Sequence, residues 1–148
     1  MRENKYICES IGNLIQVNFE RMAAFDKAAK TVEDAGLKNY FEAKANESER
    51  NIEELQQVLS EVSFPHRKLG QSTLLPASNT FAAAVYQNRI NIIIDTVKCL
   101  EMHMMEWYQQ IGDGLSNIPG EFKNLLKQQL LSLKTGYLHF RMLTSTIK

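Results

Sequence analysis

The stretch VSFPHRKLGQSTLLPASN, residues 62–79, interrupts an otherwise helical pattern and decides how the helices connect. It holds two of the three prolines of the chain, Pro65 and Pro76, and its apolar residues follow no helical period. A stretch of about 18 residues reaches roughly 60 Å when extended, whereas a helix of about 25 residues is about 37 Å long. The stretch can therefore run the whole length of a helical bundle.

Apolar residues recur at steps of three and four on both sides of this stretch, which is typical of amphipathic helices. The predicted helices cover residues 3–32, 35–61, 89–111 and 119–146. The linker between the second and third covers 62–88 and can hold a short helix at 80–87. Asp34 is expected to cap the second helix. No segment alternates with period two over a useful length, so the predicted fold class is all-α, in a single domain over 1–148.

The lengths of the connections predict the topology. The first two helices are separated by only a few residues, so they must fold back as an antiparallel hairpin, and the last two are similarly close. Two such hairpins joined by one long crossover form the ferritin-like four-helix bundle, in which the second and third long helices run parallel. A linker that only bulges at one end of the bundle would instead leave simple up-and-down order.

Composition excludes several classes of protein. The 148 residues carry 17 Lys+Arg against 17 Asp+Glu, and this balance argues against a general nucleic-acid or anionic-membrane binder. The only cysteines, Cys8 and Cys99, lie far apart, so no disulfide framework is expected. The polar N-terminus lacks the apolar stretch of a secretory signal. We therefore expect a soluble, cytoplasmic protein.

Several stretches carry a family resemblance, namely Leu14–Ala29, Asp34–Phe41, Gln128-Gln129 and His139-Phe140-Arg141. Together they resemble a bacterial family of ferritin-like four-helix bundles of unknown function. The similarity covers nearly the whole chain, in the same order and at similar spacing. Because its motifs are helix-packing and capping patterns, the resemblance implies a ferritin-like fold and carries over no substrate.

Ferritin-like folds often hold two iron or manganese ions, bound by one Glu from each of two helices and a Glu-x-x-His pair from each of the other two. Residues three apart on a helix face the same side, so both members of such a pair can reach one metal. The residues three positions before the three histidines of this chain are Ser63, Leu100 and Gly136. The usual di-iron ligands are therefore missing from the sequence, and no cofactor is expected.

The helical stripes place polar residues at the middle of the bundle. Asn18, Ser48 and Gln129 are expected on inward faces, as a central polar layer. They can hydrogen-bond one another or a trapped water, since each unsatisfied polar group costs about 1–3 kcal/mol. The alternative interpretation is an unusual iron or manganese site. Its ligands would be Glu20, Glu47, Glu101 and His139.

Other candidate sites have weaker support. The segment Glu101–Trp107 holds three methionines and His103, which are Cu(I) ligand types, but methionine commonly fills gaps in a core. Cys99 lies one turn from His103, although a cysteine in a helix is more often a small apolar side chain. The basic cluster His66-Arg67-Lys68 could contact a phosphate group, and helix-lining aromatic residues could border a small-ligand cavity.

These observations predict a non-catalytic interaction or stress-associated protein. Self-association as a homodimer is expected because some apolar residues exceed what one inward face needs. These residues are Phe19, Met105, Trp107 and Leu131. The alternative is a metal-binding oxidoreductase or iron-storage relative that uses the unusual carboxylate site.

Overall fold

The computed structural model describes residues 2–61, 73–114 and 120–145. Its helices are α1 (Arg2–Thr31), α2 (Ala35–Glu61), α3 (Ala77–Gln87), α4 (Ile90–Gly114) and α5 (Gly120–Thr144). No strand occurs in the described part of the chain, so the predicted all-α class is confirmed. None of the described helices combines the length and apolar content that crossing a bilayer requires.

The short helix α3 begins at Ala77, three residues before the start expected from the sequence. The carbonyl of Leu75 accepts hydrogen bonds from the backbone N–H of Ser78 at 2.9 Å and from its hydroxyl at 2.7 Å. Pro76 is the N-cap residue of α3, where an N–H would have no partner within the helix. At the other end, Asn88 adopts a left-handed conformation with φ 54° and closes the helix.

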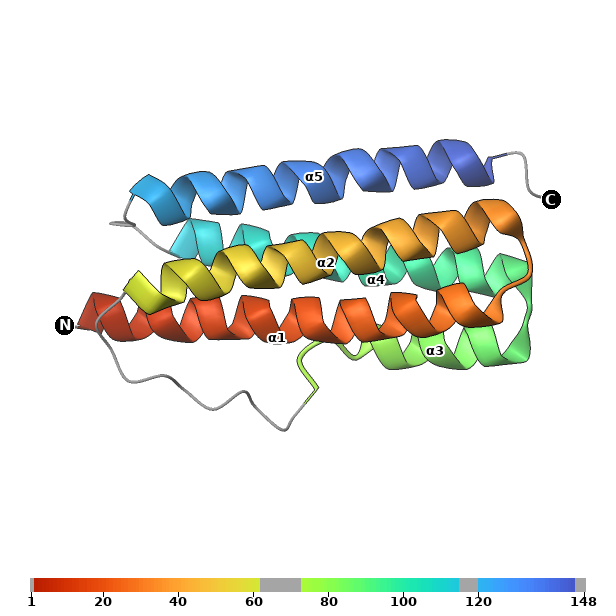
Figure 1. The fold of residues 1–148 in the computed structure, drawn as a ribbon, viewed down its shortest axis with the longest axis horizontal. Coiled ribbons are helices and arrows are strands. Elements are labelled where there is room, and N and C mark those ends of the chain that lie inside the picture. The colour runs from red at the N-terminus through yellow and green to blue at the C-terminus, as the bar shows by residue number, and fades with distance from the viewer. Residues whose placement is uncertain (1, 62–72, 115–119, 146–148) are drawn as a thin grey trace.

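The four long helices lie side by side, as Figure 1 shows. In that view α1 and α5 run from left to right, and α2 and α4 run from right to left. Helices α2 and α4 are thus parallel, whereas α1 is antiparallel to α2 and α4 is antiparallel to α5. Helix α3 packs against α1 and α4. The predicted linker residues 62–72 and the predicted helix start at Pro119 lie outside the described residues.

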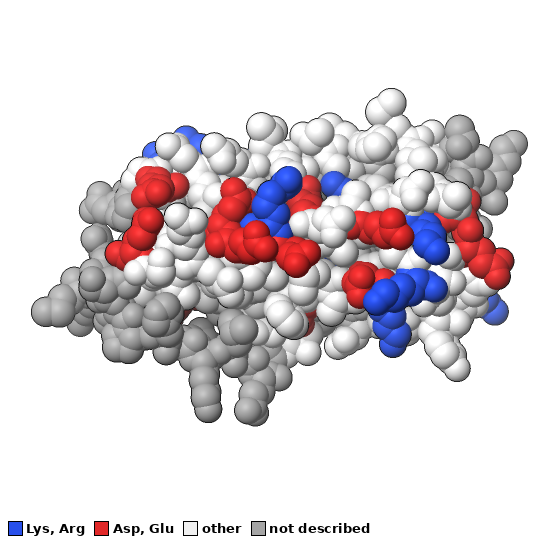
Figure 2. Space-filling model, viewed as in Figure 1, with Lys and Arg blue, Asp and Glu red and all other residues white. Residues whose placement is uncertain are grey.

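The outer side of α2 is acidic. Glu42, Glu49 and Glu53 are exposed there, and Figure 2 shows acidic side chains gathered where α2 lies in Figure 1. The exposed Arg50 lies among them in the sequence. No ion pair involves these four residues within the described chain. This face is solvated, as the charged pattern of the sequence indicates.

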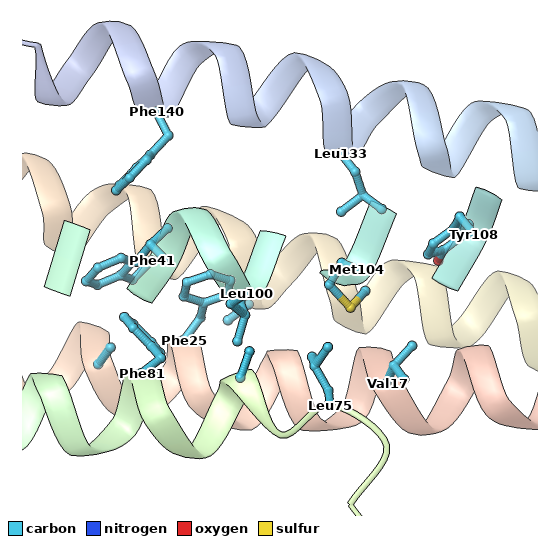
Figure 3. Packing of buried hydrophobic residues seen from close by; sticks show 14 of the residues in the cluster. Val17, Phe25, Phe41, Leu75, Phe81, Leu100, Met104, Tyr108, Leu133 and Phe140 are labelled. Atoms are coloured by element: carbon cyan, nitrogen blue, oxygen red, sulfur yellow. The ribbon is translucent and has the colours of Figure 1, made fainter. Parts of the chain in front are cut away.

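The core runs continuously along the helices and ends in an aromatic cluster (Figure 3). The ring centroid of Phe25 lies 5.5 Å from that of Phe41 and 5.3 Å from that of Phe81, and Tyr40 lies 4.7 Å from Phe140. These rings come from α1, α2, α3 and α5. Since burying one large apolar side chain contributes about 1.5–3 kcal/mol, the cluster is a major apolar contact among α1, α2, α3 and α5.

Asp34 caps α2 as the sequence predicts. Its Oδ1 accepts a hydrogen bond from the backbone N–H of Leu37 at 2.8 Å, which satisfies one of the free donors at the helix start. We expect Asp34→Ala to lower the free energy of unfolding by about 1 kcal/mol in urea titrations. The neighbouring exposed Glu33→Ala is the control, with an expected change within about 0.5 kcal/mol. Equal effects of the two changes would contradict the capping role.

Candidate functional site

A fully buried arginine, Arg21, lies at the centre of the helix assembly. Its side chain comes from α1 and is 0% exposed. Nε and Nη2 donate to the two carboxylate oxygens of Glu101 on α4, each at 2.8 Å. This two-bond geometry matches the planar guanidinium to the carboxylate, which is a strong arrangement for an ion pair. It joins α1 to α4.

Helix α2 supplies the remaining acceptors of the guanidinium. Nη1 of Arg21 donates to Ser48 Oγ at 2.8 Å and to the backbone carbonyl of Lys44 at 3.4 Å. Nη2 also lies 2.9 Å from Glu47 Oε1, as an ion pair whose angles are not those of a hydrogen bond. Each of the five N–H groups of Arg21 therefore has an oxygen nearby, as burial of a charge requires.

Glu47 extends this cluster to α5. Its Oε2 accepts a hydrogen bond from Ser132 Oγ at 2.5 Å and one from Lys44 Nζ at 3.4 Å. Gly136 of α5 has no side chain that would collide with the Lys44 ammonium. Two cations and two carboxylates thus balance in charge. We call this group the arginine cluster, made of Arg21, Lys44, Glu47, Ser48, Glu101 and Ser132.

A second polar network lies beside the arginine cluster. Asn18 Nδ2 donates to Tyr108 Oη at 2.9 Å, and the Tyr108 hydroxyl donates to Gln129 Oε1 at 2.5 Å. Asn51 Nδ2 donates to Asn18 Oδ1 at 3.2 Å, and Gln129 Nε2 donates to the backbone carbonyl of Asn51 at 3.3 Å. The predicted layer residues Asn18 and Gln129 meet in this network, while the predicted Ser48 belongs to the arginine cluster.

The structure brings together two of the four residues of the alternative metal site. Glu47 and Glu101 both contact Arg21. Glu20 is engaged elsewhere, because its carboxylate accepts the backbone N–H groups of Leu74 at 3.0 Å and Leu75 at 3.4 Å. His139 is exposed on α5. Within the described residues, no three His, Cys, Asp or Glu side chains are arranged to hold a metal ion.

Arg21 is the central residue that the sequence reasoning missed. An arginine within an amphipathic pattern is ordinarily assigned to the solvated face. Its spacing was nevertheless informative, since it stands three residues after the inward Asn18 and four before the inward Phe25. A cation on an inward stripe requires a buried counter-charge, and the acidic residues Glu47 and Glu101 supply it.

The pKa shifts of Arg21, Glu47 and the nearby Tyr40 all favour the form that each group has at neutral pH. Burial by itself would lower the pKa of Arg21, but Glu101 and Glu47 raise it above its ordinary value. Burial by itself would raise the pKa of the Glu47 carboxyl, but Arg21, the Ser132 hydroxyl and Lys44 together hold it below its usual range. Burial, with Glu101, raises the pKa of Tyr40, whose hydroxyl is buried without a hydrogen-bond partner in the described structure. None of these three groups is tuned to exchange a proton near pH 7.

The methionine-rich segment of α4 does not converge on one point. Met104 is buried, Met105 is half-buried and Met102 is exposed, so the three thioethers point in different directions. Cys99 is exposed, with Sγ 4.0 Å from His103 Nε2. A cavity of about 250 Å³ borders this side of α4. It is lined by Leu74, Leu75, Pro76, His103, Glu106, Trp107 and Gln110. The basic cluster at 66–68 lies outside the described residues.

Comparison with known proteins gives one match. A family model described as a domain of unknown function (DUF2383) matches residues 6–111. No curated protein and no solved structure matches the chain. The matched range includes Arg21, Glu47 and Glu101 and ends before α5, which carries Ser132 and Gln129.

Removing the central cation should destabilise the fold strongly. We expect Arg21→Met to lower the free energy of unfolding by about 3–5 kcal/mol, because it leaves Glu47 and Glu101 buried without their counter-charge. Adding Glu47→Gln and Glu101→Leu to the same chain should recover part of the loss, since no uncompensated carboxylate then remains. Urea titrations of the single and triple variants measure both effects.

The control for this experiment is Lys30→Met on the same helix. Lys30 is 76% exposed and pairs with Asp26 at 3.1 Å, so its loss should change the free energy of unfolding by no more than about 0.5 kcal/mol. A loss for Arg21→Met as small as that of the control would contradict a stabilising role of the buried pair.

The depressed pKa of Glu47 predicts an acid-dependent stability. The unfolded chain has Glu pKa values near 4.3, so below about pH 5 it binds more protons at this position than the folded protein. The stabilisation that Glu47 contributes is therefore fully present above about pH 5, and it is lost as the pH falls through the pKa of Glu47 in the folded protein. We expect the free energy of unfolding of Glu47→Gln to depend less steeply on pH below about 5 than that of wild type. The exposed Glu49→Gln should keep the wild-type slope, and equal slopes for all three proteins would count against this account.

Proposed function

The chain belongs to the DUF2383 family of domains of unknown function, and we propose that it is a non-catalytic interaction protein built on a ferritin-like bundle. The observation that carries the proposal is the Arg21 guanidinium, which contacts Glu47 from α2 and Glu101 from α4. In ferritin-like metal proteins, carboxylates from facing helices project into the bundle core to bind the ions. In this chain the carboxylates of Glu47 and Glu101 instead pair with the guanidinium of Arg21.

The helix directions support the ferritin-like part of the proposal. Helices α2 and α4 run parallel in Figure 1, and each is antiparallel to the neighbour with which it is paired in sequence, α1 and α5. A parallel pair that follows consecutively requires a connection running the length of the bundle. The described segment 73–89 contributes to such a connection, because it contains α3 alongside α1 and α4.

The chemistry of arginine argues for a structural centre. A guanidinium stays protonated throughout the pH range in which proteins are folded, so the positive charge is permanent. It would repel a divalent cation placed between the same carboxylates, and it already occupies both oxygens of Glu101. A metal could enter only if Arg21 gave up its partners on α2 and α4, which would leave a buried charge without compensation.

The second candidate is a metal-binding oxidoreductase or iron-storage protein. The observation in its favour is that carboxylates from two facing helices, Glu47 and Glu101, do meet at the centre. Hard carboxylate oxygens are suitable ligands for manganese and iron. His139 and Glu20 would have to move toward them, because the first is exposed and the second holds the segment before α3.

Metal content distinguishes the two candidates. The protein is produced with added iron, manganese and copper, and the metal content per chain is measured by elemental analysis for wild type and Glu101→Gln. We expect well under one ion per chain in both proteins, because Arg21 neutralises the carboxylates. One or two ions per wild-type chain that are lost in Glu101→Gln would overturn the proposal and favour the metalloprotein.

A further inference from the structure

The outer surface formed by α4 and α5 carries four large exposed apolar side chains. Met102 on α4 is 49% exposed, and on α5 Leu131 is 65%, Leu138 58% and Met142 74% exposed. These are four of the eight exposed large hydrophobic residues in the described chain. We call this surface the α4–α5 face. Grouped exposed apolar side chains mark an interaction surface more often than scattered ones do.

On α5 these side chains form a stripe that alternates with basic residues. Five exposed residues of α5 follow one another at steps of four, three, four and three. They are Lys127, Leu131, Lys134, Leu138 and Arg141. Such steps place them in one row along the helix. The row faces solvent, since Gln129, which bonds Tyr108 of α4, lies on the inward side of α5. Ser132, which contacts Glu47 of α2, lies on the opposite side of the helix.

Helix α4 carries an acidic and apolar counterpart. Four exposed residues of α4 follow one another at steps of seven, seven and four. They are Asp95, Met102, Gln109 and Asp113. This row points away from α3, since Trp107 lies on a different side of α4, where Nε1 donates to the carbonyl of Leu74 before α3 at 3.1 Å. The α4–α5 face therefore combines a row with acidic ends and a row with basic residues.

Residues of the α4 row and residues of the α5 row lie at matching heights along the helix axes. The hydrogen bond between Tyr108 and Gln129 places these residues level with each other on the antiparallel helices. With the same rise per residue on both helices, Asp95 is level with Met142, beside Arg141. Met102 is level with the middle of the α5 row, between Leu131 and Leu138. Asp113 is level with Asn124, three residues or about 4.5 Å from the level of Lys127, a distance that the long lysine side chain can span.

We propose that the α4–α5 face binds the same face of a second copy of this chain, as a two-fold symmetric dimer. A two-fold axis parallel to the helices places α5 of one copy on α4 of the other and keeps the axial levels. Met102 then packs on the partner's Leu131 and the partner's Leu138. At the two ends, Asp95 faces the partner's Arg141 and Asp113 faces the partner's Lys127.

Charge complementarity supports a second copy as the occupant. Asp95, Asp113, Lys127 and Arg141 form no ion pair within the described chain, so all four are available to a partner. An isologous contact repeats each pairing twice and closes on itself. Of the residues that the sequence suggested for self-association, Leu131 lies in this face. Trp107 is bonded to the segment before α3, and Phe19 lies on α1, which does not contact α5.

The inference rests on the proposed interaction role and supplies its partner, but the two can fail separately. The metal assay reports the centre of the bundle, whereas the dimer is tested by mass. Sedimentation equilibrium or light scattering over a range of concentrations should give about 34 kDa for wild type, twice the 17.0 kDa of one chain. A mass of one chain at the highest concentration would overturn the proposal.

Charge reversal tests which face is used. We expect Asp95→Lys with Asp113→Lys to raise the dimer dissociation constant at least about tenfold, since like charges then oppose each other. Lys127→Glu with Arg141→Glu should do the same. Combining all four changes should restore dimerisation toward wild type. The control is Glu42→Lys with Glu53→Lys on α2, which changes the net charge equally outside the face and should leave the constant unchanged.

Two further outcomes would contradict the dimer face. If the α2 control weakens the dimer as much as Asp95→Lys with Asp113→Lys does, the contact is not on α4 and α5. If wild type stays monomeric but binds vesicles containing phosphatidylserine, and loses that binding in Lys127→Glu with Arg141→Glu, the basic and apolar row serves an anionic lipid surface instead. If the fourfold variant dimerises again, that result contradicts both of these outcomes and supports the α4–α5 face.

Discussion

The contact of Arg21 with Glu101 and Glu47 constrains the whole assembly. A guanidinium that is completely removed from water requires acceptors for its donors and a counter-charge, and these come from α2 and α4. Sliding either helix by one turn would separate the partners by about 5 Å and leave charges buried without compensation. The cluster thus admits one axial register among α1, α2 and α4. Ser132 extends the same requirement to α5 through its hydrogen bond to Glu47.

Apolar packing and polar networks have different effects along the helices. The aromatic rings around Phe25 and Phe41 bury surface and tolerate small shifts, because dispersion contacts have little directionality. The hydrogen bonds around Tyr108 and Gln129 have narrow geometric limits and so distinguish one arrangement from its neighbours. Within these layers the buried carboxylates of Glu47 and Glu101 have the Arg21 guanidinium as their partner. A buried cation between acidic residues of facing helices competes with a metal ion for the same carboxylate oxygens.

The net charge of the chain is zero, but its charged residues are unevenly distributed over the surface. The exposed side of α2 gathers acidic residues such as Glu42 and Glu49, as Figure 2 shows. The exposed row of α5 instead carries basic residues that alternate with leucines, namely Lys127, Lys134 and Arg141. Because charge acts over a Debye length of about 8–10 Å, each face presents its own sign to a partner although the whole chain sums to zero. The balanced composition therefore argues against a uniformly basic or acidic protein and leaves room for a face with complementary ends.

The amino-acid pattern by itself determined the helical class, the cap at Asp34 and the inward placement of Asn18, Ser48 and Gln129. These features depend on spacing along one helix, because the helical period of 3.6 residues determines which side of the helix a residue faces. Tertiary structure decided which buried groups meet, because spacing on one helix carries no information about the axial level of another. The pairing of Arg21 with Glu101, 80 residues away, is set by how α1 and α4 lie against each other. For the same reason Glu20 and His139, which share a residue type with metal ligands, lie apart from Glu47 and Glu101 in the folded chain.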